Sequence, residues 1–422
     1  MVAVVLGPRF KSFPPAQWGM PLADFVAQRH ALDEFATPLL TIDATALAHN
    51  VDKMATWSAA RGIGLAPHGK TTMAPALWNQ VLQAGAWGLT LATPWQVQVA
   101  RSFGVARILV ANEFVDPVAL SWLAEELHAH EEFEFYCWAD STAAVAAMDA
   151  VLSESGLGPR VGVLVELGAD GGRTGARTLD AALEVASAIA GSACLHLAGV
   201  GGYEGALAHD RSPEKVRAVA GYLDKLVELH RRIEAGPGYR GRAPIVTAGG
   251  SAYFDLVADR LAPLVGSATI LLRSGAYQVH DDGFYGEISP FAHAGRHEQF
   301  HAAMHGWARV LSRPERRLAI LDGGRRDFPF DEGLPLPQRI VGLSEQESAD
   351  ILAGSAVTKL NDQHAFLRLG EHAEDGMLPV GSIVRLGLSH PCTAFDKWRL
   401  VPVVDDADLA RPRVVDAVET YF

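Results

Sequence analysis

Residues 161–201 read VGVLVELGADGGRTGARTLDAALEVASAIAGSACLHLAGVG, and this stretch decides the fold. It begins with a nearly continuous apolar run, 161–167, and ends with a second one, 195–201. An alanine-rich segment of helical character, 179–190, lies between them. Buried parallel strands read as continuous apolar runs, and two such runs joined by a helix form a crossover unit. The stretch therefore predicts a βαβ unit.

The same alternation recurs through the first two-thirds of the chain. Eight short runs of β character are separated mostly by alanine-rich or amphipathic helical segments: Ile63–Ala66, Gly88–Ala92, Arg107–Ala111, Phe133–Trp138, Val161–Leu167, Leu195–Gly201, Ile245–Ala248 and Thr269–Leu272. Eight such units predict a (β/α)8 barrel of the TIM type, which typically needs about 250 residues. A doubly wound open sheet is the structural alternative.

The sequence pattern changes near residue 300. Segments such as WARVLSR, RLAILDGG, QRIVGL, SIVRLGL and WRLVPVV are rich in β-forming residues and are separated by Gly, Pro and Asp turns. We therefore predict three parts: an N-terminal arm over 1–36, a barrel over 37–290 and a C-terminal all-β domain over 291–422 that carries a metal site. The arm is expected to pack on the β domain or on a partner subunit.

Composition and charge exclude several classes of function. The 422 residues carry a formal net charge of -13, and no basic run is present, so a nucleic-acid or anionic-membrane partner has little electrostatic support. The first apolar run is too short for a signal peptide, which predicts a soluble, cytoplasmic protein. Three cysteines far apart argue against a disulfide framework and leave a thiol available as a ligand. We expect a small-molecule substrate.

Residues 62–73, GIGLAPHGKTTM, contain a literal match to the phosphate-loop pattern of nucleotide-binding proteins. Pro67 removes a backbone N–H from that loop, and Pro75 delays the helix that should follow Lys70, so the nucleotide interpretation is disfavoured. Lys70 instead stands just past the first barrel strand, where catalytic groups gather. The chain has only seven lysines, and apart from Lys70 only Lys359 is not easily placed elsewhere. Lys70 is a candidate Schiff-base nucleophile, with a surface loop lysine as the alternative.

Residues 247–255, TAGGSAYFD, form the second pattern. A strand followed by Gly249, Gly250 and Ser251 at the start of a helix can cradle a phosphate, because glycine lets the backbone approach the oxygens and the serine hydroxyl donates a further bond. The seventh barrel strand is a common place for a cofactor phosphate. A tight turn without ligand is the alternative.

The third pattern is GLSHPCTAFD, residues 387–396. In an extended segment His390 and Cys392 would lie on the same side and would suit zinc. Two ligands are too few for a structural zinc site, so substrate or water would have to complete a catalytic one. A buried cysteine beside a hydrogen-bonded histidine is the alternative. Residues 297–301, HEQFH, match the zinc-protease motif but lack its continuation, which disfavours a metallopeptidase.

Together these patterns resemble the fold-type III pyridoxal-phosphate enzymes, and within them the D-serine dehydratase and D-threonine aldolase branch. The resemblance runs in order over most of the chain, through TPLLTIDATALAHNVDKM, PHGKTTMAP, ELGADGGRTGAR, GVGGYEGALAH, TAGGSAYF and SHPCT. It implies an alanine racemase-like barrel with a C-terminal β domain. It also implies a homodimer with the active site between subunits.

The resemblance assigns roles to single residues. Lys70 would bind pyridoxal 5'-phosphate as a Schiff base. The other cofactor-binding residues would be Gly249, Gly250 and Ser251 at the phosphate, Arg173 near the phenolic oxygen, Tyr203 beside the pyridine ring and Tyr277 at the phosphate end. Gln363 and His364 would support the metal site without binding the metal.

The metal pair bears on the type of reaction. In this family the dehydratase branch resembles His-x-Cys with zinc, whereas the aldolase branch carries His-x-Asp, and this chain has His390 and Cys392. The resemblance implies a D-serine dehydratase, or deaminase, in which Lys70 takes the Cα proton and zinc aids loss of the β-hydroxyl. Other D-3-hydroxy amino acids such as D-threonine could also react. A D-threonine aldolase, a racemase and a non-catalytic pyridoxal-phosphate-binding protein remain as alternatives.

Overall fold

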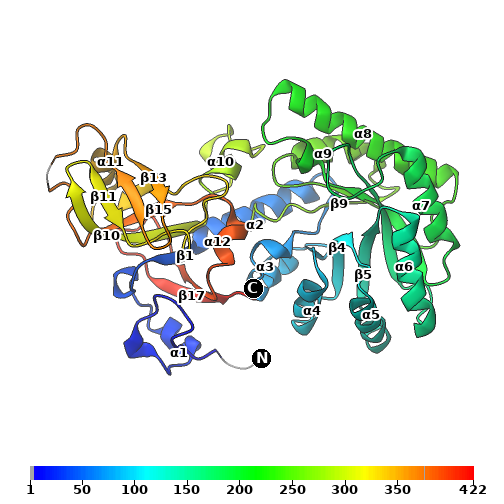
Figure 1. The fold of residues 1–422 in the computed structure, drawn as a ribbon, viewed down its shortest axis with the longest axis horizontal. Coiled ribbons are helices and arrows are strands. Elements are labelled where there is room, and N and C mark those ends of the chain that lie inside the picture. Colours follow the sequence, from blue (N-terminus) through cyan, green and yellow to red (C-terminus); the bar gives the residue numbers. More distant parts are fainter. Residues whose placement is uncertain (1–3, 375) are drawn as a thin grey trace. The chain divides into compact units, whose positions relative to one another are not determined.

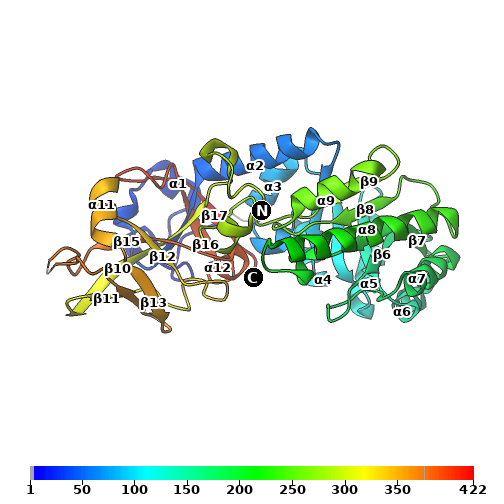
Figure 2. The ribbon, with the colours of Figure 1, turned by 90° about the horizontal axis from the view of Figure 1, so that it is seen from above.

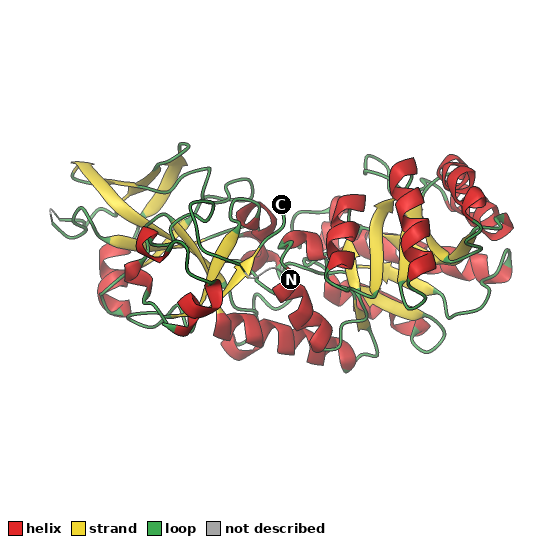
Figure 3. Cartoon of the chain, turned by 90° about the horizontal axis from the view of Figure 1, so that it is seen from below, coloured by secondary structure: helices red, strands yellow, loops and turns green. Residues whose placement is uncertain are grey.

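The computed structural model describes residues 4–374 and 376–422, which form two compact units. The barrel unit comprises residues 54–70 and 78–275. The β unit comprises the described residues of 1–53, 71–77 and 276–422. Helices surround the strands of the barrel unit, whereas strands and loops dominate the β unit (Figure 3).

The barrel unit is an eight-stranded parallel sheet that closes on itself, in the order β3-β4-β5-β6-β7-β8-β9-β2. A parallel bridge between His68 and Thr90 joins the two ends of this order, and the Thr90 N–H donates to the Pro67 carbonyl at 2.9 Å. The predicted (β/α)8 barrel is confirmed. Each predicted run corresponds to one strand: β2 (Gly64–Leu65), β3 (Leu89–Leu91), β4 (Arg107–Glu113), β5 (Glu134–Ala139), β6 (Val161–Leu167), β7 (Leu195–Gly202), β8 (Ile245–Ala248) and β9 (Thr269–Leu272).

Helices follow the strands and cover the outside of this sheet (Figure 1). Side-chain oxygens of Thr93, Asp116, Ser141 and Thr178 cap α4 to α7 by accepting a backbone N–H three residues on, which fixes where each helix begins. None of the helices in the described part of the chain has the length and apolarity that crossing a membrane requires. The helices are α2 (Ala44–Ala59), α3 (Pro75–Gln83), α4 (Pro94–Ser102), α5 (Pro117–Ala129), α6 (Thr142–Leu152), α7 (Leu179–Gly191), α8 (Pro213–Ala235) and α9 (Phe254–Leu261).

Large rings fill the barrel interior between small residues. A Cβ atom on Gly162 would lie 2.4 Å from the Tyr136 ring, and one on Gly201 would lie 2.9 Å from the indole nitrogen of Trp138. The glycines therefore make room for these rings. Outside the sheet, α8 and α9 lie side by side (Figure 2).

The β unit is built on a second, mostly antiparallel sheet, which confirms the predicted all-β domain. Its strands run in the order β13-β14-β11-β10-β1-β16-β17, with β15 also on β10 and β12 on β15. The strands are β1 (Leu39–Asp43), β10 (Met304–Glu315), β11 (Leu318–Leu321), β12 (Leu336–Ile340), β13 (Ala356–Leu360), β14 (Ala365–Arg368), β15 (Ile383–Gly387), β16 (Leu400–Val404) and β17 (Val414–Glu419). Its short helices are α1 (Leu22–Ala27), α10 (Phe284–Ile288), α11 (Glu345–Leu352) and α12 (Pro391–Phe395).

The division into units differs from the predicted ranges at both ends of the barrel. Strand β1 pairs antiparallel with β10 and parallel with β16, so residues 39–43 belong to the β unit. Residues 276–290 belong to it as well. The arm packs on the same unit, where the Leu32 N–H donates to the Pro412 carbonyl at 3.0 Å. An apolar run such as LLTID indicates a buried strand, but its partners in the fold decide which sheet it joins.

Gly199→Ala should destabilise the barrel. Gly199 lies in β7 with φ 150°, and a Cβ atom there would lie 1.9 Å from the Ile245 carbonyl oxygen of the neighbouring strand. We expect denaturant unfolding to show a loss of about 3 kcal/mol. The control is Gly221→Ala in α8, where a Cβ atom meets nothing within 4 Å. This substitution should raise the free energy of unfolding by about 0.5–1 kcal/mol. Equal stability of the two variants would contradict this packing.

Candidate active site

Polar residues follow the carboxyl ends of five barrel strands. Lys70 comes after β2, Arg173 after β6 and Tyr203 after β7, while residues 249–251 follow β8 and Arg273 follows β9. In a closed parallel sheet all carboxyl ends open at the same end of the barrel. The topology therefore gathers these residues at one mouth.

Lys70 lies in a three-residue 3-10 turn, Gly69–Thr71. Trp78 Nε1 donates to the Gly69 carbonyl oxygen at 3.0 Å and holds this turn. The next helix, α3, begins only at Pro75. A phosphate loop requires a helix directly after its lysine, so the structure does not support the nucleotide interpretation. The Lys70 side chain is half-buried.

His68, two residues before Lys70, lies among positive charges. Burial lowers the pKa of its imidazole well below the usual value, and the charges of Lys70, Arg273 and Arg173 lower it further. The imidazole is therefore neutral at physiological pH. Its Nδ1 atom is buried and, among the residues that the structure describes, has no hydrogen-bond partner. Cationic groups gathered at a strand-end mouth favour an anionic ligand.

Arg173 and Tyr203, which the resemblance assigns to the same cofactor, lie close together. The Arg173 guanidinium carbon lies 5.0 Å from the centre of the Tyr203 ring, within the range of a cation–π contact. Arg177 fixes the loop that carries Arg173, because its guanidinium donates to four carbonyl oxygens: those of Gly172, Arg173, Thr174 and Gly175.

The glycine segment after β8 already binds a carboxylate. The N–H groups of Gly249 and Gly250 donate to the two side-chain oxygens of Glu204, at 2.8 and 2.7 Å. Glu204 is fully buried. These N–H groups thus bind a side chain of the protein itself, and the phosphate role that the sequence analysis gives them stays a prediction. Ser251, the third predicted residue, is half-buried beyond them.

Arg273 is a buried cation that sequence reasoning missed. It is 3% exposed and donates to Thr247 Oγ1 at 2.7 Å and to the Gly202 carbonyl at 2.5 Å. Burial lowers its pKa, and the negative charge of Glu204 opposes this. Arg273 therefore ties its own strand end to the ends of β7 and β8. The only signal in the sequence is a lone charge directly after the apolar run 269–272.

Three carboxyl groups occupy the ends of β4, β5 and β6. Oxygens of Glu113, Asp140 and Glu166 all lie within 4.8 Å of one another. Burial, and next the charge of Glu113, raises the pKa of Glu166 to about 8. Burial also raises the pKa of Glu113. We infer that this pair holds a proton at neutral pH, because two adjacent buried carboxylates repel.

In the β unit, His390 and Cys392 lie at the start of a short helix. His390 caps α12 with a left-handed φ of 54°. The expected extended segment is wrong here, because Pro391 favours the first position of a helix. The two side chains nevertheless hydrogen-bond to each other, and this bond is the main cause that raises the pKa of His390 to about 9. The Cys392 thiol also donates to Thr71 Oγ1 at 3.6 Å.

Two aspartates that the sequence analysis missed fix His390. Asp331 Oδ2 lies 2.5 Å from His390 Nδ1, and its other oxygen accepts from Thr393 Oγ1 at 2.7 Å. Asp281, 1% exposed, accepts the His390 backbone N–H at 2.9 Å. A carboxylate on one ring nitrogen orients a histidine to ligate metal through the other. The His390 Nε2 and the Cys392 sulfur are thus the two atoms through which this pair would ligate a metal.

Comparison with known proteins places the chain in a family. A family model described as "Alanine racemase, N-terminal domain" matches residues 42–256, half of the chain. The chain belongs to this family. It is thus a member of the fold-type III pyridoxal-phosphate proteins, which confirms the resemblance read from the sequence. A second model, "Putative serine dehydratase domain", matches residues 303–404, within which His390 and Cys392 lie.

Individual relatives are similar over most of their length. The chain is 28% identical to a 3-hydroxy-D-aspartate aldolase from Paracoccus denitrificans over 365 residues, 85% of each chain. It is 25% identical to a D-threonine aldolase from an Arthrobacter species over 93% of each chain. Among solved structures, a D-threonine aldolase from Filomicrobium marinum superimposes with a TM-score of 0.77 at 23% identity, covering 93% of this chain and 97% of that one. A D-threo-3-hydroxyaspartate dehydratase from a Delftia species gives 0.71 at 22%, covering 92% and 97%.

The remaining family positions lie in the β unit. The Tyr277 ring is buried, with its centre 5.9 Å from that of Phe300. Gln363 Nε2 donates to Asp327 at 3.2 Å, and His364 is exposed. These contacts give Tyr277 a packing role and Gln363 a structural hydrogen bond. The cofactor and metal roles that the resemblance implies for these three residues stay predictions.

HEQFH does not form the helix that the zinc-protease motif requires, in line with the disfavoured metallopeptidase interpretation. That motif needs both histidines on one face of a helix. Here only a three-residue 3-10 turn, Arg296–Glu298, forms, and the His301 ring instead stacks on His49 with centres 4.2 Å apart.

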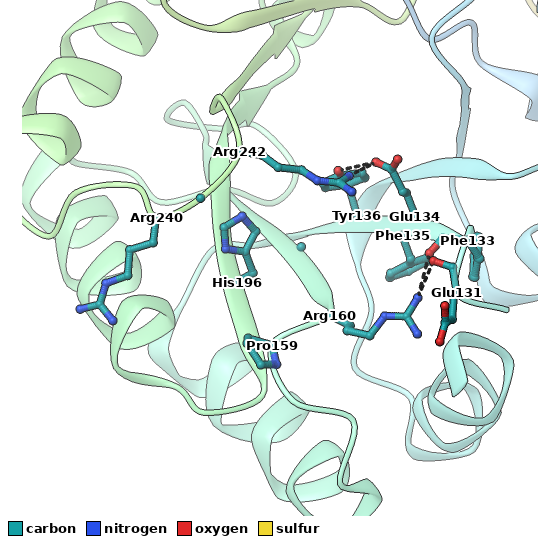
Figure 4. Close-up of a pocket in the computed structure, with 12 residues that line it drawn as sticks. Glu131, Phe133, Glu134, Phe135, Tyr136, Pro159, Arg160, His196, Arg240 and Arg242 are labelled. Carbon is teal, nitrogen blue, oxygen red and sulfur yellow. Dashed lines mark hydrogen bonds and ion pairs between the residues drawn. The ribbon is translucent and has the colours of Figure 1, made fainter. Parts of the chain in front are cut away.

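A cavity of about 350 Å³ lies at the opposite, amino ends of β5, β6 and β7 (Figure 4). One of its polar side chains, Glu134, has three partners. Glu134 accepts from Arg107 at 3.1 Å and from Tyr136 at 3.0 Å, and it pairs with Arg242 at 2.5 Å. Residues at the amino ends of barrel strands usually serve stability, so we do not assign the active site to this cavity.

The raised pKa of Glu166 predicts a pH-dependent stability. A carboxyl with a higher pKa in the folded protein stabilises it below the ordinary pKa, 4.5, and this contribution is lost as pH rises through about 8. Glu166→Gln should therefore gain stability relative to wild type, on the order of a few kcal/mol, between about pH 5 and 8.5. Denaturant unfolding at both pH values measures this, with the exposed Glu132→Gln as control. A constant difference between Glu166→Gln and wild type would contradict the assignment.

Proposed function

We propose that the protein is a pyridoxal-phosphate-dependent lyase that removes the β-hydroxyl of D-3-hydroxy amino acids, with D-serine as the first expected substrate. This is the reaction of a D-serine dehydratase, also called D-serine deaminase, and it yields a 2-oxo acid and ammonia. The observation that carries the proposal is the His390 and Cys392 donor pair, held by Asp331. The pair lies within the segment that the serine dehydratase model matches.

The barrel mouth fits pyridoxal phosphate. Its phosphate is an anion, and Lys70, Arg173 and Arg273 supply positive charge around a neutral His68, whose buried Nδ1 has no hydrogen-bond partner among the described residues. Lys70 would hold the aldehyde carbon, Arg173 and Tyr203 the ring, and Ser251 with its neighbours the phosphate. When bound, the cofactor withdraws electrons from the substrate Cα and makes its proton acidic. Family membership supports the same cofactor.

Lys70 is the residue that we assign to move the proton. The residue lies in the turn that follows β2, which Trp78 holds in place. A positioned amine of this kind can accept the Cα proton of the substrate. The half-buried side chain limits the access of water to that amine.

His390 and Cys392 suit zinc, because imidazole nitrogen and thiolate sulfur are its common ligands. With two protein ligands, water or substrate would fill the other positions. Zinc there would supply a Lewis acid for a departing hydroxyl group. Two solved structures are variants of a D-threo-3-hydroxyaspartate dehydratase in which a histidine, or a cysteine two positions later, is replaced by alanine, and the structure of the cysteine variant is of its metal-free form. The same spacing occurs between His390 and Cys392.

A D-threonine aldolase is the second candidate, since relatives that align over 85% or more of the chain are named aldolases. Aldol cleavage would break the Cα–Cβ bond and give glycine and an aldehyde, whereas dehydration keeps that bond. A non-catalytic pyridoxal-phosphate-binding protein would have no use for the donor pair of the β unit. We expect the enzyme to act as a homodimer, as the resemblance implies.

Product analysis tests the proposed reaction. The protein with bound cofactor should be yellow, should form pyruvate from D-serine but not L-serine, and should form 2-oxobutyrate from D-threonine. Lys70→Ala should lose the visible absorbance and lower kcat at least about 1,000-fold, because it removes both the attachment point and the base. The matched control is Lys359→Ala in β13, which should keep both. Glycine and acetaldehyde from D-threonine would favour the aldolase, and a colourless protein would refute the proposal.

Metal binding tests the role of the β unit. Chelation should abolish 2-oxo acid formation, and added zinc should restore it. Asp331→Asn should weaken zinc binding about 10- to 100-fold in a chelator competition assay, because the amide no longer orients His390 as a carboxylate does. Asp362→Asn, at an exposed aspartate of the same unit, is the control. Zinc affinity of Asp331→Asn equal to wild type would contradict the role of Asp331.

A further inference from the structure

Glu204 is deeply buried, and both of its carboxylate oxygens accept hydrogen bonds. It lies directly after Tyr203, at the start of the 3-10 turn Glu204–Leu207 that follows β7. Its side chain is 0% exposed, yet both oxygens accept backbone N–H groups from the segment after β8. Burying a carboxylate is costly unless it is well hydrogen-bonded. The buried, hydrogen-bonded carboxylate of Glu204 therefore indicates a specific role for this residue.

That role concerns the conformation of the glycine segment. Gly249 has φ 111°, a backbone conformation that residues with side chains rarely adopt. A Cβ atom on Gly250 would lie 3.0 Å from the Tyr203 ring and 3.6 Å from Glu204 Oε1. The segment is thus held against Tyr203 and Glu204 on one side, and charge-assisted bonds to two successive N–H groups fix its path.

Positive charge stabilises the buried carboxylate. Burial lowers the pKa of the Arg273 guanidinium. Among the groups that oppose this effect, the nearby charge of Glu204 has the largest influence. Arg273 in turn bonds to Thr247 and Gly202, at the ends of β8 and β7. Glu204 therefore stands at a junction of three strand ends. Its two bonds couple the segment after β8 to Tyr203 and to the Arg273 side chain.

We propose that Glu204 is a positioning residue for the cofactor phosphate: it holds the Gly249–Ser251 segment in the conformation in which Ser251 and its neighbours bind that phosphate. This inference rests on the proposed function and deepens it. The Gly249 and Gly250 N–H groups donate to Glu204, so in this role the phosphate contacts fall to the Ser251 side of the segment. Nothing in the sequence pattern of strand, glycines and serine indicates this division of roles.

The test compares pyridoxal 5'-phosphate with pyridoxal, which lacks the phosphate, in binding to cofactor-free protein. In Glu204→Gln one amide oxygen can still accept an N–H, but the NH2 group opposes the other. We expect the affinity for pyridoxal phosphate to fall about 10- to 100-fold, as for a lost charge-assisted hydrogen bond. The affinity for pyridoxal should stay within about twofold of wild type, because only the phosphate contacts depend on the segment.

Two further variants complete the design. Glu204→Asp keeps the carboxylate on a shorter side chain, so its affinity for pyridoxal phosphate should lie between those of Glu204→Gln and wild type. This variant still tests the role if circular dichroism shows that Glu204→Gln does not fold. The matched control is Glu134→Gln, a carboxylate with three partners at the opposite end of the strands (Figure 4), which should not change cofactor affinity. Unchanged affinity for pyridoxal phosphate in both Glu204 variants, or an equal loss for both compounds, would overturn the role. Wild-type protein that binds neither compound would overturn the proposed function and this role with it.

Discussion

The closure of the parallel sheet is the constraint on which the barrel site depends. The bridge between His68 and Thr90 joins the two ends of the strand order, so the carboxyl ends of all eight strands surround one mouth. Residues as far apart in the chain as Lys70 and Arg273 therefore act on the same imidazole. In an open sheet the ends of β2 and β3 would lie at opposite edges, and Lys70 would be remote from the residues after β4 to β6.

Charge at this mouth is divided by position. Lys70, Arg173 and Arg273 supply cations around His68, whereas the carboxyl groups of Glu113, Asp140 and Glu166 gather at the ends of β4 to β6. Glu204 is a further acidic residue, and its carboxyl group accepts two backbone N–H groups and lies near Arg273. A single anionic cofactor suits the cationic side of this arrangement, while the raised pKa of Glu166 limits the opposing negative charge.

The β unit brings the His390 and Cys392 side chains together. Two carboxylates bind the histidine: Asp331 contacts the ring nitrogen Nδ1, and Asp281 accepts the backbone N–H of His390. The left-handed turn at His390 and the short helix α12 bring Cys392 within hydrogen-bonding reach. Such supporting residues come from distant parts of the chain, so no local sequence motif predicts them.

The sequence by itself determined the eight barrel strands, the β-rich second part and the residues with distinctive local patterns, such as Lys70 and the His390 and Cys392 pair. These features depend on short-range periodicity and on residue chemistry, and both are visible in the sequence alone. Only the tertiary structure decided that residues 39–43 join the β unit, that Glu204 binds the Gly249 and Gly250 N–H groups, and that Asp331 orients His390. Each of these depends on contacts between residues that are distant in sequence, and a buried carboxylate finds its partners only when the strands are in register.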